Sequence, residues 1–103
     1  MTNAIRFHQA GGPDVLRWEA VEVGEPDRHE VVIEHGAVGL NYIDTYHRGG
    51  LYTVELPSGI GIEAAGRITA IGSSVADLQV GERVAYATGP LGAYAEQRRM
   101  PAD

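Results

Sequence analysis

Apolar residues alternate with polar ones in several short runs, and glycine or proline separates one run from the next. Along residues 30–39, for example, Val31 and Ile33 fall on one face of an extended backbone. A period of two is typical of strands that bury one face. The runs that we predict as strands are residues 4–8, 15–23, 30–39, 64–71, 80–86 and 93–99.

One stretch has the pattern of a helix, and it is short, covering residues 42–48. Asn41 is expected to cap it, and Asp44 lies in the first turn, where the helix dipole favours an acid. The glycines at 49–50 predict its end. Asp44 and Arg48 are four residues apart, so we expect them to pair on one face of this helix.

Together these elements predict a mostly β protein, a distorted β-barrel with one short helix near its mouth. Fourteen glycines among 103 residues fit frequent turns between short strands. A chain of this length can build one modest core but not two. We therefore expect residues 1–103 to form a single domain.

Charge and cysteine content exclude several function classes. The formal net charge is −6. All eight basic residues are arginines, and only Arg98 and Arg99 are adjacent to one another. A nucleic acid or an anionic lipid surface needs a basic footprint, so neither partner is expected.

There is no cysteine, and the four histidines lack the spacing of metal ligands, so we expect no metal site. The sequence has no signal-peptide pattern and no membrane span, which favours a cytoplasmic protein.

The densest group of polar and aromatic residues lies in the segment 39–66. Asn41, Tyr46 and Tyr52 could converge there if Asn41 lies just ahead of the helix and Tyr52 folds back after the double glycine. Two phenols and an amide around one cleft could hydrogen-bond a carbonyl or quinone oxygen. The structural alternative makes Asn41 a helix cap and the tyrosines half-buried packing residues.

Glu63 stands alone as an acid among the glycines and small apolar residues of 61–66. Such an acid is either paired, here with an arginine, or part of a functional site. The glycines around it do not predict a nucleotide loop. Their spacing fits neither the dinucleotide fingerprint nor the P-loop, and they lead into a strand pattern where both motifs need a helix.

Two motifs in this region resemble a known enzyme family. Residues 61–75 resemble the G-H-E-x-x-G-x-x-x-x-x-G-x-x-V signature of medium-chain zinc alcohol dehydrogenases, with Ile62 in place of a zinc-binding histidine. Residues 39–44 resemble their G-x-C-x-x-D motif, with Asn41 in place of a zinc-binding cysteine. This zinc-free pattern resembles the quinone oxidoreductases of the zeta-crystallin type. Further matching runs are residues 7–8, 11–16, 41–46, 50–52, 56–59, 81–84 and 92–94.

The resemblance implies a GroES-like catalytic domain, followed in the family by a Rossmann domain that binds NADPH. It also implies one- or two-electron reduction of quinones by a homodimer, with hydrogen bonds instead of zinc polarising the substrate carbonyl. Asn41, Tyr46 and Tyr52 match the catalytic and cofactor-binding positions that line the nicotinamide and quinone cleft. Asp44 and Glu63 match supporting positions behind them.

The sequence stops where the Rossmann domain of the resembling family has yet to begin. We therefore expect one wall of an active site, and we expect the chain alone to lack turnover and to bind NADPH weakly or not at all. Reduction of an enone or alkenal would use the same amide and phenols, so it stays open beside quinone reduction. A free-standing GroES-like interaction module is the non-catalytic alternative.

Overall fold

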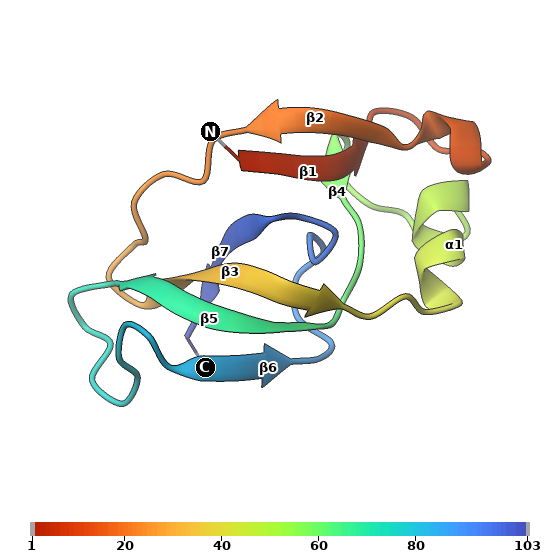
Figure 1. Cartoon of the computed structure of the whole chain (residues 1–103). Coiled ribbons are helices and arrows are strands. Elements are labelled where there is room, and N and C mark those ends of the chain that lie inside the picture. Colours follow the sequence, from red (N-terminus) through yellow and green to blue (C-terminus); the bar gives the residue numbers. More distant parts are fainter. Residues whose placement is uncertain (1, 103) are drawn as a thin grey trace.

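The computed structural model describes residues 2–102 and is a mostly β molecule with one short helix at its side (Figure 1). Among these residues no helix has the length and apolar character that crossing a membrane requires. The elements in chain order are β1 (Thr2–Phe7), the 3-10 helix η1 (Pro13–Val15), β2 (Arg17–Val21), β3 (Glu30–Val38), α1 (Ile43–Gly49), β4 (Ser58–Gly59), β5 (Ala64–Ile71), β6 (Arg83–Tyr86) and β7 (Gln97–Pro101).

The strands form two antiparallel sheets, with the orders β2-β1-β4 and β6-β5-β3-β7. Within the larger sheet the register of β3 and β5 shifts twice, between Val32 and Ile33 and between His35 and Ala37. Such irregularities bend a sheet. An isolated bridge pairs Ala4 of β1 with Ala95, two residues before β7. The expected mostly β fold with one short helix is confirmed.

Two apolar clusters fill the interior. The first joins β3, β5 and β7 of the larger sheet, and the second lies around Phe7 of β1. Tyr94 packs against the second cluster, which places this part of the core behind the candidate site described below. The buried members are Val31, Ile33, Ile68 and Met100 in the first cluster and Phe7, Val15 and Ile60 in the second.

The strand pattern predicted β5 with its bounds. The strands predicted over 4–8 and 80–86 are Thr2–Phe7 and Arg83–Tyr86 in the structure, and the two-residue strand β4 was not predicted. The predicted strand at 15–23 is shorter in the structure, because Pro13 opens a 3-10 turn that includes Val15. The strand β2 therefore begins at Arg17. Alternation alone did not distinguish this buried turn residue from the first residue of a strand.

The last strand begins at Gln97, whereas the sequence pattern predicted residue 93 as its start. The cause is a competing set of backbone hydrogen bonds. Ala93 donates its N–H to the carbonyl of Gly61 at 3.3 Å, and Tyr94 donates to Ile60 at 2.9 Å. These residues therefore form a loop against the segment before β5.

The helix α1 begins one residue later than predicted and stops, as predicted, at the glycine pair, where Gly50 has a left-handed φ of 87°. The expected pair between Asp44 and Arg48 was wrong. Arg48 Nε donates to the carbonyl of Gly11 at 3.2 Å, and the N–H of Gly11 donates to the carbonyl of Arg48 at 3.0 Å. These reciprocal bonds attach the end of α1 to the turn after β1.

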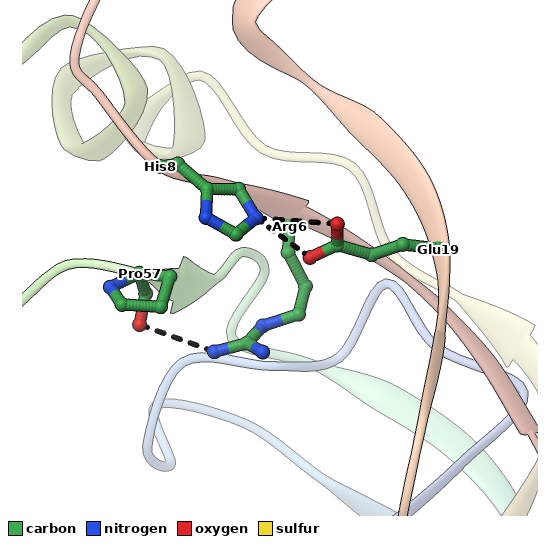
Figure 2. Close-up of polar contacts among 4 residues, drawn as sticks. All are labelled: Arg6, His8, Glu19 and Pro57. Atoms are coloured by element: carbon green, nitrogen blue, oxygen red, sulfur yellow. Dashed lines mark hydrogen bonds and ion pairs between the residues drawn. The ribbon is translucent and has the colours of Figure 1, made fainter.

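The strand β1 also fixes the segment between α1 and β4. Figure 2 shows Arg6 Nη2 donating to the carbonyl of Pro57 at 3.2 Å. Next to it, His8 Nε2 lies 2.9 Å from the carboxylate of Glu19 on β2. Arg6 therefore holds the far end of the segment that carries Tyr52.

A second polar network surrounds His35 of β3. Its Nδ1 donates to the carbonyl of Ala95 at 2.8 Å, and its Nε2 accepts from the hydroxyl of Tyr86 at 2.9 Å. The guanidinium of Arg98 lies over the ring of Tyr86, with 5.5 Å between its central carbon and the ring centroid. Burial lowers the pKa of His35, the charge of Arg98 lowers it further, and the bond to Ala95 opposes this.

We expect the free energy of unfolding to decrease on acidification, in part because of His35. Its pKa is lower in the folded state than the ordinary value of about 6.5 in the unfolded state, so below that pH the unfolded state binds more protons. His35→Gln removes the titrating group and should weaken the pH dependence. Urea unfolding of both proteins near neutral pH and about one pH unit below 6.5 measures this. An unchanged pH dependence in His35→Gln would contradict the expectation.

Candidate active site

The candidate site starts where the end of β3 meets the segment before β5. The N–H of Gly39 donates to the carbonyl of Glu63 at 3.1 Å. A Cβ at Gly39 would lie 2.5 Å from Cγ and 2.7 Å from Cδ of Glu63, which is closer than such atoms can approach. The glycine therefore leaves the space through which the side chain of Glu63 passes.

The side chain of Glu63 reaches Asn41, whose Nδ2 donates to Oε1 at 2.5 Å. The expected role of Asn41 as a helix cap was wrong: the cap position is Tyr42, with no side-chain capping bond, and the Asn41 amide is used by Glu63. For Glu63 the sequence left an arginine pair and a functional role open, and no arginine pairs with it among residues 2–102. An amide has two N–H donors, so Asn41 keeps one N–H and its carbonyl for a ligand.

We expect Gly39→Ala to destabilise the protein by about 1–3 kcal/mol, the usual cost of overpacking. The new methyl group would displace Glu63 and break its hydrogen bond with Asn41. Urea unfolding measures the loss, and the side-chain amide resonances of Asn41 should shift. Gly36→Ala is the control, because a Cβ there would lie 3.9 Å from its nearest neighbour, the carbonyl oxygen of Ala65. Equal stability of the two variants would show that Gly39 does not constrain Glu63.

Asp44, in the first turn of α1, is buried, with 3% of its surface exposed. Its Oδ2 accepts two hydrogen bonds, from the backbone N–H of Asn41 at 3.1 Å and from the hydroxyl of Tyr94 at 2.5 Å. Burial raises the pKa of Tyr94, and the hydrogen bond and charge of Asp44 raise it further. The phenol therefore keeps its proton near neutral pH and acts as a donor to the carboxylate.

Sequence reasoning missed Tyr94 as a contributor to this site. It lies in one of the runs that match the resembling family, residues 92–94, which was the available signal. Nothing in its local pattern points to Asp44, because the two residues are 50 positions apart.

A row of aromatic rings continues from Asn41 along α1. The ring of Tyr42 meets that of Tyr46 edge to face, with centroids 5.3 Å apart, and Tyr46 meets Tyr52 in the same way at 5.7 Å. The backbone N–H of Tyr52 also donates to the carbonyl of Tyr46 at 3.4 Å. The row is open to solvent, with Tyr42 75% and Tyr52 49% exposed. Tyr52 therefore folds back onto α1, as the sequence suggested.

His47 ends the aromatic row, its ring centroid 5.8 Å from that of Tyr52. His47 is half-buried, and its Nδ1 is a buried atom without a hydrogen-bond partner among residues 2–102. Neither His47 nor Tyr42 was among the predicted site residues.

The predicted site residues thus fall into two groups. Asn41 is joined to Glu63 and Asp44, and Tyr46 is joined to Tyr52. Within residues 2–102 no side-chain hydrogen bond connects Asn41 to either phenol. The link is Tyr42, which follows Asn41 in the chain and contacts Tyr46. The arrangement offers an oriented amide donor at one end of an exposed aromatic face.

Metal ligands do not gather in the part of the chain that the structure describes. Over residues 2–102 there is no group of three or more His, Asp or Glu side chains that could hold a metal ion. The side chains of the candidate site carry amide, phenol and carboxylate groups, which are able to form hydrogen bonds with a ligand.

Comparison with known families gives this arrangement a context. The sequence model of the alcohol dehydrogenase GroES-like domain matches residues 27–103, more than half of the chain and all of the site described above. The chain belongs to the alcohol dehydrogenase GroES-like domain family. The resemblance stated from the motifs is therefore confirmed at the level of the family and its fold.

Relatives of this GroES-like domain are oxidoreductases. The quinone oxidoreductase of Pseudomonas aeruginosa is 53% identical over 97 residues, covering 93% of the chain and 30% of that protein. The 2-haloacrylate reductase of a Burkholderia species is 43% identical over 107 residues, covering 100% of the chain and 32% of that protein. The crystal structure of Escherichia coli quinone oxidoreductase complexed with NADPH superposes with a TM-score of 0.94 at 44% identity, covering 97% of the chain and 31% of that structure. The GroES-like domain thus spans about 30% of the length of the curated relatives it matches.

Proposed function

We propose that this GroES-like domain, residues 1–103, is the substrate-side wall of an NADPH-dependent quinone oxidoreductase that extends beyond these residues. The observation that carries the proposal is the amide of Asn41, held by Glu63 at the start of the aromatic row Tyr42–Tyr46–Tyr52. The names of the relatives support the substrate class, and the NADPH complex of the E. coli relative supports the cofactor. By the same family resemblance we propose a cytoplasmic homodimer.

The residues fit the nicotinamide end of NADPH. An exposed row of aromatic rings suits a planar heterocycle, and the free N–H and carbonyl of Asn41 suit its carboxamide or a substrate oxygen. The phosphates do not fit here. Gly61, in the glycine-rich segment that leads to Glu63, is buried, and a Cβ there would strike the ring of Tyr94. We therefore propose that the phosphates and adenosine are bound by a domain outside these residues.

When bound, NADPH supplies a hydride. The oxygen of the quinone gains negative charge as its ring is reduced, and hydrogen-bond donors aimed at that oxygen stabilise the transition state. Asn41 donates its second N–H to this oxygen, while Glu63 keeps the amide in one orientation. The phenols of Tyr46 and Tyr52 add donors and form the apolar wall on which the flat substrate lies. Each phenol can also donate its proton to the reduced oxygen and regain a proton from solvent.

The same donors explain how the reaction runs without zinc, which we propose for this protein. Asn41 and Ile62 occupy the motif positions that hold metal ligands in the zinc-dependent family members. An amide is a poor ligand for zinc and an alkyl side chain is none. Hydrogen bonds from Asn41 then take over the polarisation of the carbonyl.

The decisive experiment is an NADPH oxidation assay with 1,4-benzoquinone, run on this chain and on the full reading frame that encodes it. We expect turnover by the longer protein, unchanged by a metal chelator, and none by the 103-residue chain. Saturable activity of the chain alone would refute the proposal that the cofactor is bound mainly elsewhere. If the reading frame ends at residue 103 and the chain is inactive, the domain is an interaction module instead.

A second substrate class has support of its own. The Burkholderia relative is a 2-haloacrylate reductase, and an acrylate contains a carbon–carbon double bond conjugated to a carboxyl group. A hydrogen-bonded carbonyl would then stabilise an enolate with the same Asn41 donor. Comparing kcat/KM for benzoquinone, a simple enone and 2-chloroacrylate on the longer protein distinguishes the two classes.

A further inference from the structure

We propose that Tyr94 is a positioning residue, which holds Asn41 in the site through the buried carboxylate of Asp44. The inference depends on the proposed function only where it predicts how a substitution of Tyr94 changes enzymatic activity. The arrangement itself concerns three residues of this chain, and it can be tested without any substrate.

The contacts form a short chain through one oxygen atom. The hydroxyl of Tyr94 donates to Asp44 Oδ2 at 2.5 Å, and the backbone N–H of Asn41 donates to the same atom at 3.1 Å. The other oxygen, Oδ1, is buried and has no hydrogen-bond partner among residues 2–102. A buried carboxylate depends strongly on the few donors it has. Loss of the phenol would leave the Asn41 N–H as its sole partner.

Tyr94 is fixed independently of α1. Its N–H donates to the carbonyl of Ile60 at 2.9 Å, and its carbonyl accepts from the N–H of Ile5 at 2.8 Å. Its ring lies against Gly61, where a Cβ would be 2.5 Å from Cδ1, and packs on the cluster around Phe7. The phenol is therefore held by β1 and by the segment before β5. It forms a rigid point to which the first turn of α1 is attached.

The complementary contact explains why this matters for the site. Asn41 is held at its backbone by Asp44 and at its side chain by Glu63. The hydrogen bond to Glu63 holds only the end of the Asn41 side chain. The backbone of Asn41 must also be fixed if the side-chain amide is to keep one position. Through Asp44, Tyr94 thus helps to restrain the backbone of Asn41, while Glu63 restrains its side chain. Because the phenol stays protonated near neutral pH, this restraint should not vary with pH in that range.

The test is Tyr94→Phe in the 103-residue chain, followed by amide hydrogen exchange measured by NMR. The substitution keeps the ring and removes the one hydroxyl. We expect the backbone amide of Asn41 to exchange about 10-fold faster or more, as for the loss of a charge-assisted hydrogen bond. Core amides such as that of Ile33 should be unchanged. Tyr86→Phe is the matched control, since it removes a hydroxyl bonded to His35 and should leave Asn41 unaffected.

Two outcomes would overturn the proposal. Unchanged exchange at Asn41 would show that the phenol restrains nothing there, and equal acceleration at Asn41 and Ile33 would make Tyr94 an ordinary packing residue. If Tyr94→Phe does not fold, Asp44→Asn serves instead. It keeps the shape and an acceptor oxygen, so Asn41 should exchange faster by a smaller factor, and no change would again overturn the proposal.

Activity gives the independent second readout. In the full reading frame, Tyr94→Phe should lower kcat for benzoquinone by about 10-fold with little change in KM for NADPH, because the donor amide is displaced from the reacting oxygen. Absence of any quinone activity in the wild-type protein would instead defeat the proposed function. The exchange result at Asn41 would still stand or fall by itself.

Discussion

Gly61→Ala is expected to lower the free energy of unfolding by about 3 kcal/mol, from two separable causes. Gly61 has a φ of +97°, a conformation that costs an L residue on the order of 1–2 kcal/mol. The added Cβ would also lie 2.5 Å from Cδ1 of Tyr94 and 3.1 Å from Cβ of Ala93. Overpacking of this kind costs about 1–3 kcal/mol. Tyr94 cannot move aside easily, because backbone hydrogen bonds to Ile5 and Ile60 hold it on both sides.

Gly81→Ala is the matched control for the first of these causes. Gly81 has nearly the same φ, +94°, but a Cβ there would meet no atom within 4 Å. Urea unfolding of both variants, with unchanged m values, therefore isolates the clash with Tyr94 as the difference between them. If Gly61→Ala were no less stable than Gly81→Ala, the Tyr94 ring would be free to shift, and its proposed role as a fixed point would be weakened.

The local pattern of the sequence was sufficient for the regular elements. The alternation over residues 64–71 predicted β5 with its bounds, and the glycine pair predicted where α1 stops. Both signals are local, because a strand buries every second residue and a left-handed helix end favours glycine. The last strand was placed too early because residues 93 and 94 bond to the segment before β5. A hydrogen-bond partner so far away in the sequence does not change the local alternation of apolar and polar residues.

The same limit applied to the candidate site. The contact of Tyr46 with Tyr52 could be predicted, since a double glycine between them lets the chain fold back. The capping role of Asn41 was inferred from its place before a helix, yet its side chain prefers a carboxylate 22 residues later. The carboxylate accepts a charge-assisted hydrogen bond from the amide N–H, and this bond orients the side chain toward Glu63 rather than toward the backbone N–H groups of the helix. Glu63 was found as a candidate, but the choice between an arginine pair and a functional role stayed open, because sequence alone does not say which polar group lies opposite.

The largest effect on catalysis is expected from Asn41→Ala in the full reading frame. We expect kcat for benzoquinone to fall about 100-fold, as when one donor of an oxyanion site is removed. The substitution removes the N–H that we propose to donate to the substrate oxygen, and it also leaves Glu63 without its partner. Steady-state NADPH oxidation measures it. Asn3→Ala is the matched control, because Asn3 lies on β1, away from the site, and should leave kcat unchanged.

The division of the loss between kcat and KM decides which role Asn41 has. A donor that acts on the charge developing in the transition state affects kcat, whereas a group that only holds NADPH raises the KM for NADPH and leaves kcat intact. Glu63→Gln refines the comparison, since its side chain still offers an oxygen to the amide but no charge. It should lower kcat less than Asn41→Ala does. A kcat for Asn41→Ala equal to that of the wild type would remove Asn41 from the chemistry and leave the phenols of Tyr46 and Tyr52 as the donors.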